Sequence, residues 1–225
     1  MSSDLNFLAF SFQIVIPRLL EGMLVTLKLS FLSAIFGIMI SIILVLMRVS
    51  NFKLLKFFTI CYVAIFRGTP LLLQILFIYF ALPTLLNCNL DALPAGVLAL
   101  SLNSAAYLTE IFRSGIESIP KGQTEASLAL GLSKSQTLFK VIIPQTYRRI
   151  IPPVMNEFSS LTKETSLVSV ISLSEMLYIT QRLGAKYLRP WEVYIWSAIG
   201  YLIIVLFLSY LASQLEKYFL KRGGV

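Results

Sequence analysis

The chain has 225 residues, of which 57% are apolar and only 13% are charged, about half the charged share of a soluble domain. So little charge cannot cover the surface of a soluble fold, and the composition predicts an integral membrane protein with several spans. Histidine is absent, which excludes a His general base, a Ser-His triad and a His metal site. The two cysteines, Cys61 and Cys88, are too few for a disulfide framework or a Cys-only zinc site. The net charge of +8 would suggest nucleic acid in a soluble chain, but here predicts basic residues gathered on one side of a bilayer.

Residues 1–20 precede the first long apolar run. They lack the basic start of a signal peptide and carry Asp4. Within them, residues 5–16 are apolar but too short to cross a bilayer, which takes about 20 residues. We therefore expect an N-terminal segment that lies on the extracytoplasmic interface rather than a sixth span.

Five apolar runs predict an all-α membrane domain over residues 21–218. The second run is interrupted at residues 67–70, where Pro70 removes a backbone donor and Gly68 loosens the same turn. The fourth run is unusually polar. An odd number of spans places the two termini on opposite sides. The predicted spans cover residues 22–47, 54–82, 95–112, 151–173 and 194–215.

The basic residues divide unevenly between the two sets of loops. Four lie on the side of the N-terminus: Arg18, Arg182, Lys186 and Arg189. Twelve lie on the other side: Arg48, Lys53, Lys56, Arg113, Lys121, Lys134, Lys140, Arg148, Arg149, Lys217, Lys221 and Arg222. Because cytoplasmic loops carry the excess of Lys and Arg, the N-terminus is predicted outside and the tail at residues 219–225 in the cytoplasm.

The loop at residues 114–149, on the basic side, has the pattern of two short helices. Thr124 is placed to cap the first helix, and Gly131 is placed where a C′ glycine ends it. Ser133 and Gln136 have capping-box spacing for the second helix, which we expect Pro144 to interrupt. The apolar face of this hairpin packs either on its own bundle and the lipid headgroups or on a partner.

The same loop resembles the "EAA" coupling motif of ABC importer permeases, whose form is EAA-x3-G-x9-I-x-L-P. The third Ala, the Ile and the Leu of the motif are replaced here by Ser, Val and Ile, and the spacing matches throughout. The residues that carry the resemblance are Glu125, Ala126, Ser127, Gly131, Val141, Ile143 and Pro144. The resemblance implies that Glu125, Ala126, Ser127, Gly131 and Pro144 couple the membrane domain to an ATPase.

Other segments are similar to the subfamily that takes up polar amino acids, the histidine, glutamine and arginine type. These segments begin at Glu21, Arg67, Ala105, Glu110 and Lys163. The resemblance implies a bacterial inner-membrane protein that pairs with a second permease chain, identical or similar. It further implies a cytoplasmic ATPase dimer that holds ATP and Mg, and an extracytoplasmic solute-binding protein. This chain lacks a G-x-x-x-x-G-K-[ST] phosphate loop. We thus expect no cofactor and no enzymatic activity of its own.

The fourth predicted span carries the polar residues that are costliest in a membrane, and such residues are candidates for a functional site. Lys163 shares a helix face with Ser160 and Ser166, and Glu164 lies about 100° away around the axis. Opposite charges on adjoining faces suit a zwitterionic solute, since an ammonium group binds a carboxylate and a carboxylate binds an amine. The alternative is a structural network at a dimer seam, and for Glu157, nearer the inner end, we favour that alternative.

In the third span, Asn103, Tyr107 and Glu110 share one face. Asn103, near mid-membrane, and Tyr107 are predicted along the substrate pathway, and Glu110 as the partner of a basic neighbour. We expect Arg67 to be buried in the broken second span, where it gates the pathway, binds freed carbonyls or pairs with Glu164 or Glu110. A secondary, ion-coupled transporter would use the same charges and remains the main alternative function.

Overall fold

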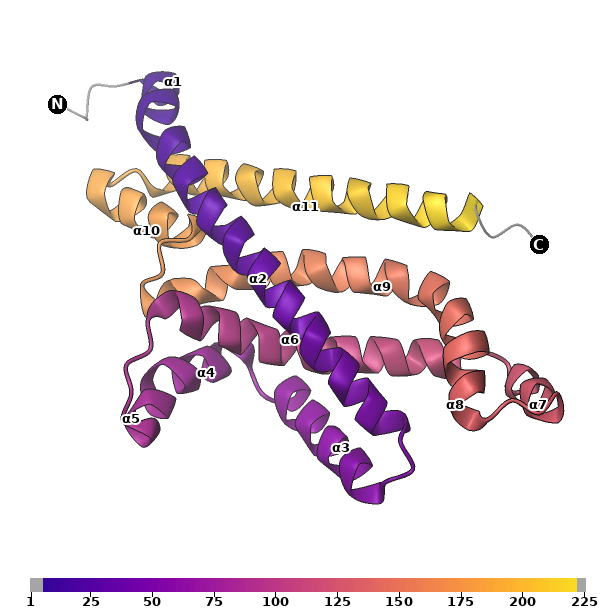
Figure 1. Cartoon of the computed structure of the whole chain (residues 1–225). Coiled ribbons are helices and arrows are strands. Elements are labelled where there is room, and N and C mark those ends of the chain that lie inside the picture. The colour runs from indigo at the N-terminus through magenta and orange to yellow at the C-terminus, as the bar shows by residue number, and fades with distance from the viewer. Residues whose placement is uncertain (1–5, 222–225) are drawn as a thin grey trace.

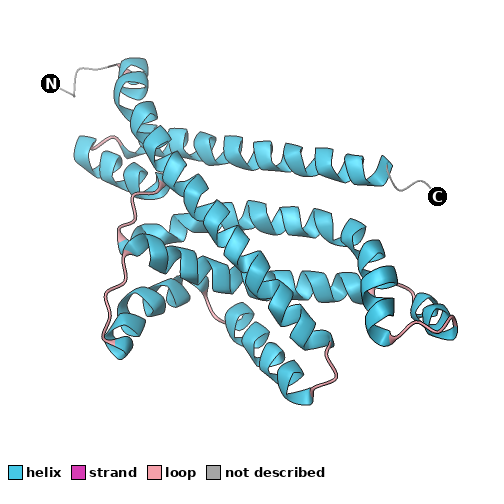
Figure 2. Ribbon diagram, viewed as in Figure 1, coloured by secondary structure: helices cyan, strands magenta, loops and turns pink. Residues whose placement is uncertain are grey.

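The computed structural model describes residues 6–221, and within that range the chain is helical with short connections and no strand (Figure 2). The principal helices in chain order are α1 (Phe7–Phe10), α2 (Ile16–Val49), α3 (Lys53–Gly68), α4 (Leu71–Leu76), α5 (Leu82–Leu86), α6 (Ala92–Glu117), α7 (Lys121–Ala129), α8 (Lys134–Thr137), α9 (Ile143–Glu164), α10 (Met176–Tyr187) and α11 (Pro190–Lys221). Three π-helical turns, η1 (Ser11–Val15), η2 (Phe77–Ala81) and η3 (Leu138–Ile142), and one 3₁₀ helix, η4 (Thr165–Ile171), join them.

The N-terminal helices form one continuous rod over Phe7–Val49, 43 residues long. At 1.5 Å per residue it measures about 65 Å, twice the hydrocarbon core of a bilayer. It crosses the other helices diagonally in Figure 1. The boundary that we expected between residues 20 and 21 is therefore absent, because no residue there ends the helix. Residues 7–20 are the first turns of this rod, and their position at the membrane interface stays a prediction.

Each π-helical turn is followed by one α-helical residue and then by a proline: Pro17, Pro83 or Pro144. Proline has no N–H and its ring clashes with the carbonyl four residues earlier. A π turn shifts the hydrogen bonding by one residue, as in the bond from the Ile143 N–H to the Leu138 carbonyl, and so accommodates the proline. Our prediction that Pro144 interrupts the helix is therefore wrong. Residues 134–164 are helical throughout, with a bend between α8 and α9 (Figure 1).

The second predicted span is broken, as the sequence indicated. Its two halves, Lys53–Gly68 and Leu71–Leu86, are bent by 104°. Three other segments are long and apolar enough to cross a membrane, namely Phe7–Val49, Ala92–Glu117 and Pro190–Gln214. Helix α9 is long enough but too polar to qualify by composition. The depth of each segment in the bilayer remains a prediction.

Two clusters of buried side chains form the core. One lies between α2, α4, α6, α9 and η4 around Leu100 and Leu161, and the other joins the N-terminal rod to α10 and α11 around Phe10 and Met176. Helices α6 and α9 approach closely at Gly115, where a Cβ would overlap the Ile150 side chain. The N-terminal end, α5 and α10 lie at one end of the molecule, and α7, α8 and the end of α11 lie at the other (Figure 1). The side of the membrane that each end faces stays a prediction.

Candidate functional site

The polar face of α9 is partly open. Lys163 is exposed, whereas Ser160, Glu164 and Ser166 are half-buried. The Ser160 hydroxyl donates to the Glu164 carboxylate at 3.4 Å, and the Ser166 hydroxyl donates to the Lys163 carbonyl at 2.7 Å. Among the residues that the structure describes, Lys163 forms no ion pair. A cation and a carboxylate on adjoining faces are thus both available to a ligand or to a neighbouring chain, as the sequence pattern suggested.

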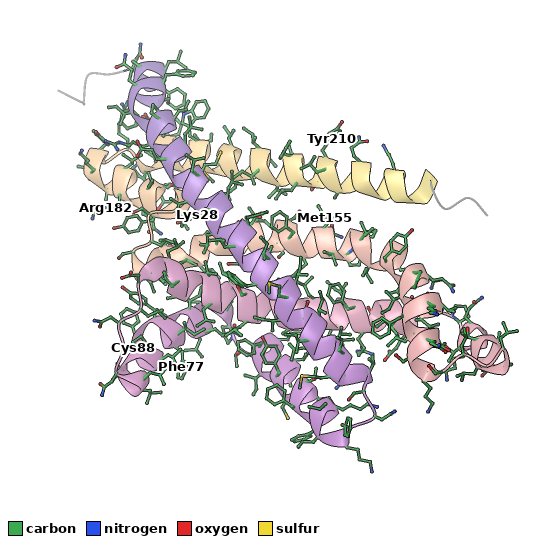
Figure 3. The ribbon with its side chains drawn as sticks, viewed as in Figure 1. Lys28, Phe77, Cys88, Met155, Arg182 and Tyr210 are labelled. Carbon is green, nitrogen blue, oxygen red and sulfur yellow. The ribbon has the colours of Figure 1, made fainter. Side chains whose placement is uncertain are left out.

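Glu157 lies one turn before Ser160 on α9 and forms a hydrogen bond with α6. Its Oε1 accepts a hydrogen bond from the Ser104 hydroxyl at 2.9 Å, and it borders an apolar groove of about 270 Å³ between α2, α6 and α9. Met155 projects from the same stretch of α9 in Figure 3. The Ser104 contact agrees with a structural part for Glu157. Sequence reasoning missed Ser104, because its helix offers many small residues and only the fold selects this one.

Asn103 is buried, but it faces the broken span instead of a cavity. Its Nδ2 donates to the Gln74 Oε1 at 3.0 Å and to the Phe66 carbonyl at 3.2 Å. The Gln74 Nε2 in turn donates to the Phe66 carbonyl at 2.9 Å and to the Thr69 carbonyl at 3.2 Å. Both amides thus satisfy carbonyls that the break leaves without helical partners. These contacts show that Asn103 has hydrogen-bond partners at the break, and its predicted contact with substrate stays a prediction. They also reveal Gln74, a polar residue within a predicted span that the sequence analysis missed.

Arg67 lies at the same break and is exposed, not buried. Its guanidinium carbon stacks 5.1 Å from the centre of the Tyr107 ring, so two predicted pathway residues do meet. Glu110, one turn along α6 from Tyr107, pairs with the Arg113 Nη2 at 2.8 Å. The predicted basic partner of Glu110 is therefore present, and Arg67 remains free of any ion pair within the described part of the chain.

The loop between α6 and α9 projects from one end of the molecule, with α7 outermost (Figure 1). Helix α7 begins at Lys121, one turn before the start that we predicted, so Thr124 lies inside it and does not cap it. Its end agrees with the prediction. Gly131 has φ of 85°, its N–H bonds to the Leu128 carbonyl, and the Leu132 N–H bonds to the Ser127 carbonyl. This is a Schellman motif, for which glycine is the favoured residue.

Helix α8 opens with the predicted capping box. The Gln136 N–H donates to the Ser133 hydroxyl, and the Ser133 N–H donates to the Gln136 side chain. The motif residues Glu125 and Ala126 are exposed, while the Ser127 hydroxyl is buried and donates to the Gln123 carbonyl at 2.6 Å. Apolar side chains are also exposed here, with Leu130 at 84%. This hairpin therefore presents its motif outward and does not fold it against its own bundle.

The family model for the inner membrane component of binding-protein-dependent transport systems matches residues 37–223. The chain belongs to this family. The arginine transport system permease protein ArtQ of Bacillus subtilis (strain 168) is 40% identical over 202 residues, covering 90% of this chain and 92% of that protein. The L-cystine permease protein TcyB of the same organism is 42% identical, covering 89% and 86%. The glutamine permease protein GlnP of Escherichia coli (strain K12) is 38% identical, covering 90% and 93%.

Solved structures agree. The crystal structure of an amino acid ABC transporter with histidines matches with a TM-score of 0.89 and 36% identity, covering 95% of this chain and 99% of that chain. An inward-facing structure of the methionine ABC transporter MetNI matches with a TM-score of 0.77 at 19% identity, which supports the fold alone. The all-helical permease fold that the sequence predicted is confirmed.

Proposed function

We propose that the chain is the transmembrane permease subunit of an ABC importer that moves a polar or charged amino acid into the cytoplasm. The observation that carries this proposal is the outward-facing α7, which holds Glu125 and Ala126 at the tip of a multi-span family member. Leu128 and Leu130 are also exposed at the end of this helix, and a docked partner would remove their apolar surface from water.

Under this proposal, α7 docks in a groove of a cytoplasmic ATPase dimer that binds ATP and Mg and performs the hydrolysis. The present chain is a transport subunit and not an enzyme. Glu125 and Ala126 contact the ATPase, and the left-handed turn at Gly131 brings the backbone close to it. The π-helical turn Leu138–Ile142 before Pro144 joins the hairpin to α9 and passes its movement into that helix.

The solute reaches the pathway from an extracytoplasmic binding protein, with the N-terminus outside the cell membrane of a bacterium. Relatives named for arginine, L-cystine and glutamine share a substrate class, the α-amino acids. Every α-amino acid carries a carboxylate and an ammonium group. Lys163 and Arg67 supply cations for the carboxylate, Glu164 supplies an anion for the ammonium group, and a second permease chain closes the open polar strip.

The test uses proteoliposomes that contain this chain, its ATPase and its binding protein. Uptake of labelled arginine, cystine and glutamine is measured in competition with analogues that lack either the amine or the carboxylate. We expect one of the amino acids to be transported and both truncated analogues to compete poorly. Equal competition by a simple amine or a simple carboxylate would contradict a site for the zwitterion.

A further inference from the structure

An unusually long 3₁₀ segment continues the pathway helix toward the outer end. The seven residues Thr165–Ile171 follow Lys163 and Glu164 directly and include Ser166. Runs of 3₁₀ helix longer than three or four residues are uncommon, and such a stretch often marks a functional hinge. The segment ends at Ser172, whose φ of 62° lies in the left-handed region that few residues other than glycine adopt. Two uncommon backbone conformations, a long 3₁₀ helix and a left-handed residue, thus lie beside the candidate solute contacts.

Glu175 lies just beyond this segment and is completely buried. Its carboxylate caps α10, accepting the Tyr178 N–H at 2.6 Å and the Leu177 N–H at 2.9 Å. It also accepts the Tyr201 hydroxyl of α11 at 2.8 Å. A cap needs only one small acceptor oxygen, and Ser, Asp or Asn normally supplies it. The bond to Tyr201 is not needed for the cap. It joins the chain after η4 to α11.

The same polar network reaches the other end of the 3₁₀ segment. The Thr26 hydroxyl of α2 accepts the Met176 N–H at 3.2 Å. The hydroxyls of Thr26 and Thr165 also face the Glu175–Tyr201 pair, and both threonines are completely buried. Thr165 is the first residue of η4, and its hydroxyl donates to the Thr162 carbonyl at 2.8 Å. Buried polar groups therefore lie beside the segment at both of its ends.

The beginning of α10 is tightly packed beside this network. Met176 is seated between two glycines, and a Cβ on Gly22 would lie 2.8 Å from its Cα while a Cβ on Gly200 would lie 3.0 Å from its Sδ. The outer part of α2, α10 and the outer part of α11 therefore form one fixed unit (Figure 1). Segment η4 is the connection between this unit and the polar face of α9.

We propose that Glu175 is a positioning residue for transport, which through Tyr201 holds η4 in its 3₁₀ winding, and that η4 rewinds as an α-helix when the pathway switches sides. Rewinding seven residues from 3.0 to 3.6 residues per turn rotates one end against the other by about 140° and shortens the segment by about 3.5 Å. The facing of Lys163, Glu164 and Ser166 changes accordingly relative to the fixed outer unit. The proposal rests on the proposed transport function and deepens it.

The first test removes one hydroxyl. Tyr201→Phe deletes the bond to Glu175, and Tyr210→Phe makes the same chemical change on an exposed side chain of the same helix (Figure 3). Each variant is reconstituted with the ATPase and the binding protein, and the amino acid transported per ATP hydrolysed is measured. We expect Tyr201→Phe to lower this ratio about tenfold, the factor that corresponds to one hydrogen bond to a charged group. Tyr210→Phe should leave the ratio unchanged. A parallel loss of uptake and ATP hydrolysis would indicate a merely structural part and overturn the proposal.

The second test follows the winding itself. Spin labels at Asn156→Cys on α9 and Arg182→Cys on α10, two exposed positions on opposite sides of η4, report their separation by pulsed EPR in a chain with Cys61→Ser and Cys88→Ser. Figure 3 labels Arg182 and Cys88. We expect a second distance population that needs ATP in the parent and appears without ATP in Tyr201→Phe and in Glu175→Gln. Distances identical to those of Tyr210→Phe, or a loss of folded protein in both network variants, would overturn the proposal. If the parent transports nothing with ATP, the proposed function fails instead, and the EPR populations still decide the winding.

Discussion

In the coupling hairpin and in the broken second span, helix ends leave backbone groups without helical partners. The two regions satisfy these groups in opposite ways. In the hairpin, the ends of α7 and α8 are satisfied by residues within five positions of them, through the Schellman turn at Gly131 and the capping box at Ser133. At the break after Arg67, the freed Phe66 carbonyl is satisfied by Gln74, eight residues on, and by Asn103 from another helix. A surface element that docks on another protein must form its hydrogen bonds within its own stretch of chain. A buried element can form them with residues of other helices.

The largest effect is expected where the hairpin meets its proposed partner. Glu125→Lys reverses the charge of an exposed motif residue, and removing one member of a buried charge pair costs about 2–5 kcal/mol. Uptake in the reconstituted importer should fall at least about 30-fold, while the free chain keeps its thermal stability. Ser135→Lys places the same cationic side chain at an exposed position of the neighbouring helix α8 and serves as the control. Equal uptake by the Glu125 variant and the control would remove α7 from the coupling surface.

A smaller effect is expected on the polar face of α9. Lys163→Gln removes the exposed cation that we assign to the solute carboxylate, and a hydrogen bond to a charged group contributes about 1.5–3 kcal/mol. The KM for uptake should rise roughly tenfold or more, with little change in ATP hydrolysis without solute. Lys28→Gln, on α2, is the matched control (Figure 3). An unchanged KM would indicate that Lys163 faces another chain and not the solute.

The third prediction tests the hydrogen bonds that Gln74 forms at the break in the second span. Gln74→Leu keeps the size of the side chain but leaves the Phe66 carbonyl and the Asn103 amide with fewer partners, at a cost of about 1–3 kcal/mol. The free energy of unfolding in detergent should fall by that amount. Gln181→Leu makes the same change on the exposed face of α10 and should be nearly neutral. Similar stability of the two variants would mean that the break is held by packing alone.

The smallest effect is expected in the hairpin's own turn. Gly131→Ala forces a Cβ into the left-handed region and should destabilise the hairpin by about 1–2 kcal/mol. Gly122→Ala lies in the helix α7 with open space around it and should stabilise by up to about 1 kcal/mol. Hydrogen exchange of the α7 amides measures both. Slower exchange in both variants would contradict the need for glycine at position 131.

These contrasts also explain which features could be predicted from sequence. The break near Pro70, the stop at Gly131 and the cap at Ser133 depend on short stretches of chain and were predicted correctly. The start of α7 and the continuation of the helix through Pro144 were not predicted correctly. The π-helical turn η3, which lets the helix continue, follows from the geometry of the whole segment.

The site residues also divide into those placed by local sequence and those placed by contacts between distant residues. The open cation at Lys163 and the neighbouring Glu164 follow from helical periodicity, so the sequence could place them on adjoining faces. The contacts of Asn103 with Gln74, and of Glu175 with Tyr201, join residues 26 or more positions apart. No local pattern contains such pairs, and only the packing of α4, α6, α10 and α11 brings them together.

The central claim is that this chain transports solute only with energy from a partner ATPase. The most direct measurement is uptake of a labelled polar amino acid into proteoliposomes that hold the chain, its ATPase and its binding protein, with either ATP or an imposed ion gradient. We expect uptake with ATP and none with the gradient alone. Uptake driven by the gradient without ATP would contradict it and make the chain a secondary transporter.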